Sequence, residues 1–511
     1  MTLNNNPPIN WRTFLICVTI SLGQVVGAYE SALIGTTLQK TDFMQRMALW
    51  DSGGNQTPDY SSREGAIVGL FQCGAVFGNI IAAIIMDRWG RKAGLLVGSV
   101  VSLPALAGMT GAMGLPEFLV FRFLAGLGTW CCGTSASAYI PELAPPAYRG
   151  FFAGMNGVMI GVGLCLASYI GMGFYFSENV VAQWRAPMGI PLFCPLVLLC
   201  VIPFLPESPR YLLLKDRPEE ARRIYNDLNA TPNSSPAEIS GLDEEFTQMK
   251  RQAEHDRSLD SSWKAFLTHP VNRKRVFIAI MLGFLGQSTG VFVINNYGQT
   301  FYQKLGFGPD ARQILQGNRD LIALLGNMLG TWIIDRAGRR PVLLVAFVGC
   351  FVCVLLEAIM VALYADSDNT AGKNTGVALL YIFLMFYASG IDVGTYVYIG
   401  EMFPNHLRVK GVAIGLSSLT VTATIYLSVT STAFEAIGWK FFLLFAVLSL
   451  CGTIWIALFI PETRCLPLEE IEALFGNTQD TVVISSARMV QVGQGGDTGE
   501  AEKGMVEHVE R

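Results

Sequence analysis

Asp87-Arg88-Trp89-Gly90-Arg91-Lys92 is a charged run that follows a long apolar stretch, and about half the chain later it returns as Asp335-Arg336-Ala337-Gly338-Arg339-Arg340. Two more charged motifs return at a similar spacing. Glu142 with Arg149 returns as Glu401 with Arg408, and Glu207 returns as Glu462. Repeats of this kind are typical of secondary transporters, which are built from two similar halves. The spacing therefore predicts two homologous membrane halves.

The composition also indicates a membrane protein, because 51% of the 511 residues are hydrophobic and only 15% are charged. A helix needs about 20 apolar residues to cross the hydrocarbon core of a bilayer. Six apolar stretches precede a long polar segment and six follow it, at 13–37, 65–86, 93–113, 117–139, 151–176, 187–205, 276–302, 311–334, 341–364, 376–400, 411–435 and 439–460. We expect an all-α integral membrane protein with twelve spans in two pseudo-symmetric six-helix bundles.

The basic residues predict the orientation of these spans. Lys and Arg gather in the connections at 88–92, 149, 210–275, 336–340 and 408–410, which all fall on one side and are therefore expected to be cytoplasmic. Residues 1–12 lack a basic region with a cleavage site, so we expect the first span to be retained. The predicted parts are a cytoplasmic N-terminus (1–12), a bundle (13–205), a cytoplasmic loop with amphipathic helices (206–275), a second bundle (276–460) and a cytoplasmic tail (461–511) that is disordered after about 476.

The charged motifs belong to longer patterns that occur in a fixed order. These are Tyr139-Ile-Pro-Glu142-Leu-Ala-Pro145, Pro206-Glu-Ser-Pro-Arg-Tyr-Leu212 and Pro461-Glu-Thr-Arg-Cys-Leu-Pro-Leu-Glu-Glu-Ile471, together with the doubled run. Over about residues 13–475 the chain resembles the sugar porter family of the major facilitator superfamily. The stretches 290–297 and 391–396 look most like those of fungal hexose and oligosaccharide permeases. The resemblance implies the major facilitator fold and transport of a sugar-like substrate by alternating access.

Charged residues at the inner ends of the spans form a predicted cytoplasmic gate. Acidic and basic side chains there can pair, hold the inner side shut and separate as the halves rock. The resemblance suggests that Asp87 pairs with Arg149, and Asp335 with Arg408. Alternatively, the charges only set the orientation or reach toward water. The predicted gate residues are Asp87, Arg88, Arg91, Glu142, Arg149, Glu207, Asp335, Arg336, Arg339, Glu401, Arg408 and Glu462.

Glu30 and Arg122 are charges inside predicted spans, where a charged side chain costs about 2.5–3.5 kcal/mol on insertion scales. Counting along the first and fourth spans places both in the outer half of the membrane at compatible depths. The resemblance aligns Glu30 with an acid that takes part in proton coupling and Arg122 with its arginine partner. The pair is thus predicted to be a proton switch in a symporter, with a static ion pair in a passive uniporter as the alternative.

Asp392 is a third charge inside a span, and the family pattern does not include it. It falls slightly inside the midplane of the tenth span. Its carboxylate could accept hydrogen bonds from substrate hydroxyls, hold a second proton, or bond the backbone near Gly390 and Gly394. We expect a role in the cavity, whereas Glu357 in the ninth span is expected to pack within its own bundle.

Gln287 falls near the midplane of the seventh span, where transporters of this kind bind substrate. The resemblance matches it to one glutamine of a family pair and places Asn296 and Tyr297 at the outer gate. Gly157, Phe292 and Thr420 depart from the family's sugar contacts. The predicted substrate residues are Gln287, Asn156, Asn295, Asn296, Tyr297, Asp392 and Tyr396. The alternative for Asn156 and Asn295 is that they only form hydrogen bonds between helices.

The preferred function is a proton-coupled importer of a hexose in the plasma membrane, working as a monomer. A disaccharide, a polyol, a quinate-like acid or an exported metabolite stays open as substrate, as does a facilitative uniporter or exporter. A sugar sensor that does not transport is a further alternative, but the chain lacks the long cytoplasmic extension of such sensors.

Other classes of function find little support in the sequence. The cysteines show no metal-ligand spacing, and there is no nucleophile–base constellation or phosphate loop, so we expect no metal, no cofactor, no nucleic-acid partner and no enzyme activity. Asn55-Gln56-Thr57 lies in the long outer loop 38–64, where Asn55 is a predicted glycosylation acceptor.

Overall fold

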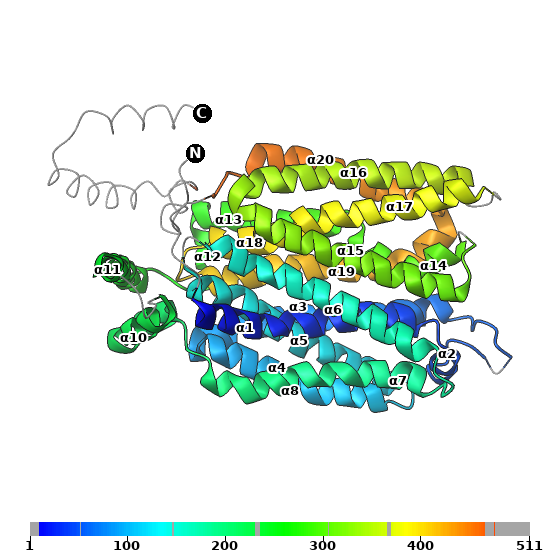
Figure 1. Ribbon diagram of the computed structural model, residues 1–511, viewed down its shortest axis with the longest axis horizontal. Coiled ribbons are helices and arrows are strands. Elements are labelled where there is room, and N and C mark those ends of the chain that lie inside the picture. Colours follow the sequence, from blue (N-terminus) through cyan, green and yellow to red (C-terminus); the bar gives the residue numbers. More distant parts are fainter. Residues whose placement is uncertain are drawn as a thin grey trace.

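The computed structural model of this protein describes residues 10–51, 53–145, 148–229, 236–304, 306–364, 369–464 and 475. The first nine residues of the predicted N-terminal segment and the tail predicted to be disordered after about 476 lie outside the described residues. Apart from one isolated bridge between Trp50 and Gln56, the regular structure in the described ranges is helical. The long helices run side by side along the longest axis of the molecule (Figure 1).

Each half of the chain contributes a group of these long helices. The first half contains α1 (Trp11–Thr37), α3 (Tyr60–Trp89), α4 (Arg91–Gly111), α5 (Leu115–Leu143), α6 (Arg149–Tyr175) and the stretch formed by α7 (Ala182–Gly189), η2 (Ile190–Leu192), α8 (Phe193–Val201) and η3 (Ile202–Phe204). The second half contains α13 (Pro270–Gln287) with α14 (Val291–Lys304), α15 (Pro309–Ala337), α16 (Arg339–Tyr364), α17 (Thr370–Phe386) with η4 (Tyr387–Asp392) and α18 (Val393–Met402), α19 (Arg408–Ile437) and α20 (Lys440–Phe459).

Eleven helical stretches in the described ranges are long and apolar enough to cross a membrane. The remaining predicted span, 311–334, falls on α15, which has a comparable length and lies among the others (Figure 1). Arg319 and Asp320 lie within α15 and lower its apolar character. Each of the twelve predicted spans therefore corresponds to a helix or to an interrupted helical stretch.

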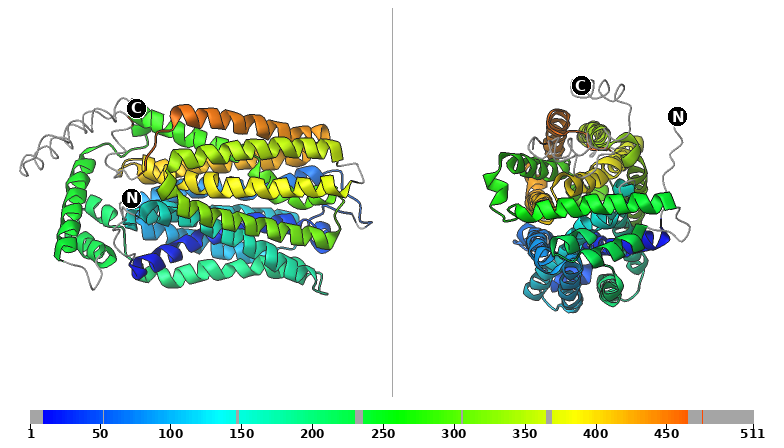
Figure 2. Two further views of the ribbon diagram at one scale, coloured as in Figure 1. Left: turned by 45° about the horizontal axis from the view of Figure 1, so that its top comes forward. Right: turned by 90° about the vertical axis from the view of Figure 1, so that its left-hand side faces the viewer.

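Short helices mark the two ends of the bundle. The loop predicted to contain amphipathic helices forms α9 (Pro209–Leu214), α10 (Pro218–Asn229), α11 (Pro236–Ser258) and α12 (Ala265–Thr268). Figure 2 shows α11 lying across one end of the bundle, which we call the inner end. The opposite end carries α2 (Thr41–Arg46), and we call it the outer end.

The two copies of the charged run adopt the same backbone conformation. Gly90 lies between α3 and α4 with a φ of 101°, and Gly338 lies between α15 and α16 with a φ of 94°. Residues with a side chain rarely adopt this left-handed region, so glycine permits the sharp turn from one helix into the next. The sequence repeat is thus also a structural repeat.

Two pairs of helices join the halves along their length. α3 of the first half packs against α19 of the second, and α6 packs against α15. Two other helices of the second half are interrupted near the middle of the bundle. α13 ends at Gln287 and α14 begins after Gly290, whose φ is 89°, while η4 is a π-helical turn between α17 and α18. Such interruptions in long helices are frequently associated with functional sites.

Candidate functional site

A central cavity lies between the two halves, and both helix breaks contribute to it. Gln287 is the last residue of α13, and Tyr387 and Asp392 belong to η4. The remaining polar lining comes from both halves. The lining side chains with polar atoms are Gln24, Ser31, Thr129, Trp130, Gln287, Asn295, Asn327, Tyr387, Asp392 and Tyr396.

Several polar atoms at this cavity are buried and have no hydrogen-bond partner among the described residues. Gln287 donates a hydrogen bond of 3.2 Å from Nε2 to the Tyr387 hydroxyl, but its Oε1 atom has no partner. The Oδ1 atom of Asn295 and the indole Nε1 of Trp130 are also unpaired. Leaving such a group unpaired costs about 1–3 kcal/mol, and a bound solute with hydroxyl groups would recover this free energy.

Four of the seven predicted substrate residues line the cavity, namely Gln287, Asn295, Asp392 and Tyr396. The other three do not line it. Asn156 donates to the Ala153 carbonyl at 2.9 Å and accepts from Gln24 at 3.3 Å, so it joins helices, as the alternative interpretation expected. Asn296 donates to the Phe292 carbonyl within α14 at 3.0 Å, and Tyr297 donates to the Leu427 carbonyl of α19 at 3.3 Å.

Sequence reasoning missed Gln24, Ser31, Thr129, Trp130, Asn327 and Tyr387, which also line the cavity. Gln24 is held firmly, because its Nε2 atom lies 3.0 Å from the Gly133 carbonyl and 3.1 Å from the Ser137 hydroxyl. A polar residue in the middle of an apolar span is a usable signal for such a position. Apart from that signal, only the packing of the helices shows which of these side chains reach the centre.

Asp392 lies in η4, and its side chain is partly exposed to the cavity. Asn327 of α15 lines the same cavity, and neither polar atom of its amide has a hydrogen-bond partner among the described residues. Among the described residues, no hydrogen bond joins the Asp392 carboxylate to the backbone near Gly390 or Gly394, so the geometry favours a cavity role over the backbone alternative.

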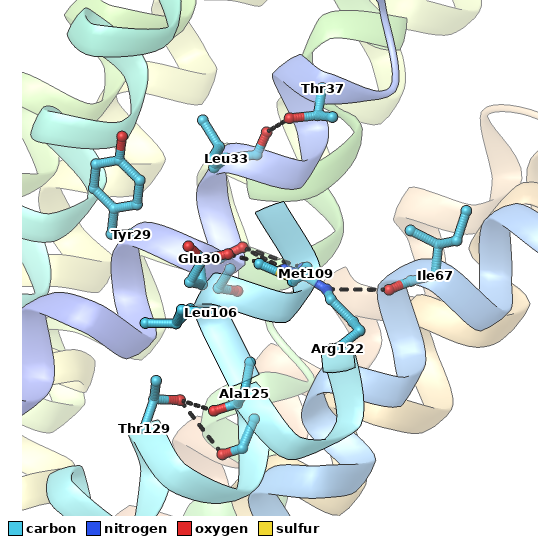
Figure 3. A network of polar contacts seen from close by, with 12 residues as sticks. Tyr29, Glu30, Leu33, Thr37, Ile67, Leu106, Met109, Arg122, Ala125 and Thr129 are labelled. Atoms are coloured by element: carbon cyan, nitrogen blue, oxygen red, sulfur yellow. Dashed lines mark hydrogen bonds and ion pairs between the residues drawn. The ribbon is translucent and has the colours of Figure 1, made fainter. Parts of the chain in front are cut away.

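Glu30 and Arg122 meet in a network of polar contacts (Figure 3), and both are almost fully buried. Arg122 of α5 lies with Nη1 at 3.3 Å from Glu30 Oε2. Both of its Nη atoms also donate to the Glu30 backbone carbonyl at 3.1 Å, and its Nε donates to the Ile67 carbonyl at 3.3 Å. Within the described part of the chain, Glu30 Oε1 has no hydrogen-bond partner. The guanidinium thus makes more contacts with carbonyl groups than with the carboxylate.

A second buried charged pair, Arg319 and Asp320, was missed by sequence analysis although both residues stand within a predicted span. Arg319 contacts Asp320 Oδ1 at 2.7 Å and donates to the carbonyl groups of Ile294 and Asn295 in α14 at 2.9 and 3.3 Å. The hydroxyl of Ser168 in α6 donates to Asp320 Oδ2. This cluster connects the halves toward the outer end and holds the backbone that carries the cavity residue Asn295.

The inner end contains two ionic networks that repeat the same geometry. Arg91 contacts Glu142 at 2.7 Å, and Arg339 contacts Glu401 at 2.8 Å, with all four side chains buried. Glu207 accepts from the backbone N–H of Arg91 at 3.0 Å, as Glu462 does from that of Arg339 at 2.9 Å. Burial raises the pKa of the Glu207 carboxyl above its usual range. Each network lies within one half of the molecule.

The two predicted gate pairs are not formed. Asp87 instead contacts Lys410 Nζ of α19 at 2.7 Å. Asp335 contacts Arg339 at 3.0 Å and accepts from the backbone N–H of Phe151 in α6 at 2.8 Å. The physical reason is helix packing, because α3 ends against α19 and α15 ends against α6. Each acid therefore reaches the opposite half, whereas the predicted partners lie in its own half.

The other predicted gate residues have different surroundings. Arg149 and Arg408 are buried, and Arg408 donates to the Phe403 carbonyl at 3.3 Å. Arg88 and Arg336 are exposed and lie over the rings of Trp89 and Trp332, 5.2 and 3.7 Å from the ring centroids. Exposed arginines over aromatic rings at a helix end fit the alternative in which charges reach toward water.

Asn55 lies in the outer-end loop between α2 and α3 and is exposed. Its backbone N–H donates to Asp51 Oδ1 at 2.8 Å. An exposed position is necessary for glycosylation but does not demonstrate it, so the modification stays a prediction.

Comparisons with known proteins identify relatives that align with 91% of this chain. The probable quinate permease of Aspergillus clavatus is 30% identical over 485 residues, which cover 91% of this chain and 88% of that protein. The probable quinate permease of Aspergillus flavus is 29% identical, with the same coverage. The MFS-type transporter criB of Aspergillus cristatus is 27% identical and is covered to 95%. These names differ from the hexose and oligosaccharide permeases that the two short stretches suggested.

Solved structures show the same fold. The MFS proton:xylose symporter XylE bound to 6-bromo-6-deoxy-D-glucose superposes with a TM-score of 0.79 at 20% sequence identity, covering 91% of this chain and 99% of that one. The predicted fold class, an all-α membrane protein of the major facilitator fold, is confirmed. The family model "Sugar (and other) transporter" matches residues 16–475. The chain therefore belongs to the sugar transporter family of the major facilitator superfamily.

Proposed function

We propose that this protein is a proton symporter that imports a sugar or a related small hydroxylated solute by alternating access. The observation that carries the proposal is the buried Glu30–Arg122 pair beside the central cavity. A carboxylate buried in a membrane protein has to be paired or protonated, because an isolated charge there is costly. Two of the similar proteins support the class of activity, since one is named a proton:xylose symporter and another a probable quinate permease.

The geometry of the pair suits reversible protonation. The carboxylate contact between Arg122 and Glu30 is long, at 3.3 Å, compared with about 2.7–2.9 Å for a strong charge-assisted hydrogen bond. When Glu30 takes up a proton, Arg122 keeps its three contacts to the carbonyl groups of Glu30 and Ile67. Protonation therefore weakens one contact and leaves the arginine solvated by the protein.

The position of Glu30 connects proton binding to the substrate site. Gly27 and Ser31 line the cavity on the same turn of α1 as Glu30. A shift of α1 on protonation would change the cavity lining directly. This coupling would make the affinity for the solute depend on the proton, as symport requires.

Contacts between the halves at both ends support alternating access. Lys410 and Asp87 join them at the inner end, and Ser168 and Asp320 join them toward the outer end. The cavity lies between these two sets of contacts. Opening either end requires one set to break while the other holds, which is the expected behaviour of two halves that rock around a central site.

The proposed setting is the plasma membrane, with the inner end and both termini in the cytoplasm, and with the monomer as the working unit. The basic residues at the inner end support this orientation under the positive-inside rule. In this orientation Asn55 faces the outside, where it would be available for glycosylation.

A passive uniporter or exporter is the second candidate, because a fully buried Glu30–Arg122 pair would also serve as a static structural contact. Uptake into proteoliposomes separates the two functions. Labelled sugars, polyols and quinate are supplied with and without an imposed pH gradient. Symport predicts accumulation driven by the gradient, whereas a uniporter only equilibrates the solute.

Glu30→Gln, which imitates the protonated carboxyl, sharpens this test. We expect it to abolish uphill accumulation but to retain exchange of solute across the membrane, because exchange does not need proton release. Glu357→Gln is a matched control, since Glu357 is another buried acid in a span but does not line the cavity. If Glu30→Gln accumulates solute as the wild type does, the symport proposal is wrong.

A further inference from the structure

The side chains that line the central cavity include one acidic group and no basic group among the described residues. Asp392 is the only Asp, Glu, Lys, Arg or His among the described residues that line it. The rest of the polar lining consists of amides, hydroxyl groups and one indole. A solute in this cavity therefore meets a carboxylate and no lining cation.

The two buried arginines described above, Arg122 and Arg319, do not supply a positive charge to the cavity. Arg122 is engaged by Glu30 and by carbonyl groups, and Arg319 is engaged by Asp320 and by the carbonyl groups of Ile294 and Asn295. Neither residue lines the cavity. Each positive charge is compensated within its own cluster, so neither arginine is available to a carboxylate in the cavity.

The unpaired atoms at the cavity are uncharged and include both acceptors and donors. Gln287 Oε1, Asn295 Oδ1 and Asn327 Oδ1 are acceptors without a partner among the described residues, and Trp130 Nε1 and Asn327 Nδ2 are donors without one. Hydroxyl groups suit this mixture, because each hydroxyl both donates and accepts. An ionised carboxylate only accepts, and in this cavity it would lie near the Asp392 carboxylate without a lining cation to pair with.

We propose that Asp392 determines the charge class of the substrate, so that the site accepts neutral polyhydroxylated solutes and rejects carboxylates such as quinate. This rests on the proposed function only in taking the central cavity as the substrate site. Rejection follows from burying two like charges without a counter-charge, a common route to specificity. On this basis the chain differs in substrate from the relatives named quinate permeases.

Binding of a matched pair of probes to the purified full-length protein tests the proposal. The probes are quinate and its uncharged methyl ester, with glucuronate and glucose as a second pair. Binding is followed by tryptophan fluorescence, and Trp130→Phe shows which part of the signal comes from the cavity indole. We expect each neutral member to bind at least about tenfold more tightly than its acid, a factor that corresponds to about 1.4 kcal/mol.

Two variants identify Asp392 as the cause. Asp392→Asn should bring the ratio of the binding affinities for the methyl ester and for quinate close to one, because quinate then binds more tightly. Asn327→Lys adds a cation to the cavity that Asp392 lines and should shift the preference toward quinate in the same direction. Glu357→Gln, which removes a buried acid away from the cavity, should leave the ratio as in the wild type.

The proposal is overturned if quinate binds as tightly as its ester in the wild type. It is also overturned if Asp392→Asn and Asn327→Lys both keep the wild-type ratio. Binding is measured without a pH gradient, so a failure of proton coupling would leave this result unaffected. A uniporter would thus fail the symport test and still show the predicted selection by charge.

Discussion

Lys410 of α19 contacts Asp87 at the end of α3 at a distance of 2.7 Å, and this ion pair joins the two halves at the inner end. Its pseudo-symmetric counterpart is the hydrogen bond from the Phe151 backbone N–H to Asp335, at 2.8 Å. The two copies of one motif therefore close the same end of the molecule through different partners. One contact depends on a side-chain charge and the other on the backbone.

This difference predicts unequal effects of gate mutations. Asp87→Asn and Asp335→Asn should both loosen the inner end, so turnover should change more than apparent affinity. Exchanging the charges, with Asp87→Lys and Lys410→Asp together, should restore closure only at the first site, because a backbone donor cannot be exchanged. Gly400→Cys reports on opening of the inner end. A Cβ at this position lies 3.6 Å from Pro141 of the other half, so the new thiol is covered while the halves are in contact and becomes accessible when they separate.

All proteins carry serine in place of the exposed Cys200 and Cys451. The rate at which a thiol reagent labels Gly400→Cys is then compared with and without each aspartate substitution. Glu219→Gln, which neutralises an exposed acid on α10, serves as the control. Unchanged labelling together with normal turnover in both aspartate variants would contradict a gating role.

Gln287 should contribute directly to solute binding. Its Nε2 atom bonds Tyr387 and its Oε1 atom is unpaired at the cavity, so Gln287→Ala removes one potential solute contact and leaves the Tyr387 hydroxyl without its donor. A loss of about 1–3 kcal/mol corresponds to about tenfold weaker binding or more. Competition by unlabelled solute in proteoliposomes measures this change. Gln313→Ala, a buried glutamine away from the cavity, should remain within about twofold of the wild type, and a similar result for Gln287→Ala would remove it from the site.

Asp320 should be a major contributor to stability. Asp320→Asn leaves Arg319 buried without its counter-charge, and breaking a buried pair in this way costs about 3–5 kcal/mol. Replacing both residues, by Arg319→Met with Asp320→Leu, should recover part of the loss, because the desolvated charges are then absent. Thermal unfolding in detergent, monitored with the single and double variants, measures the difference. If the double variant is less stable than Asp320→Asn, the carbonyl contacts of Arg319 outweigh the ion pair.

Ser168→Ala tests the other contact of the same cluster. It removes the hydroxyl that joins α6 to Asp320 but keeps the Arg319–Asp320 pair. We therefore expect a smaller loss of stability than for Asp320→Asn and a faster opening of the outer end. Equal destabilisation by the two variants would show that the cross-half hydrogen bond, and not the ion pair, is the dominant interaction.

The sequence alone determined the features that depend on local chemistry. Apolar length defined the spans, and the repeated run predicted two similar halves, in which Gly90 and Gly338 occupy equivalent turns. The compatible depths of Glu30 and Arg122 also followed from counting residues, because the rise of a helix is constant, and the two side chains meet in the structure. These predictions succeed since each depends on neighbours in the chain or on a fixed helical geometry.

Only the tertiary structure decided which side chains meet across helices. Asp87 and Asp335 found partners in the opposite half because α3 packs against α19 and α15 against α6. The same packing turned Asn156 toward Gln24 and placed Asn327 at the cavity. The depth of a residue in a span is set by its position in the chain, but the direction in which it points is set by the rotation and neighbours of its helix, which no local pattern in a uniformly apolar span specifies.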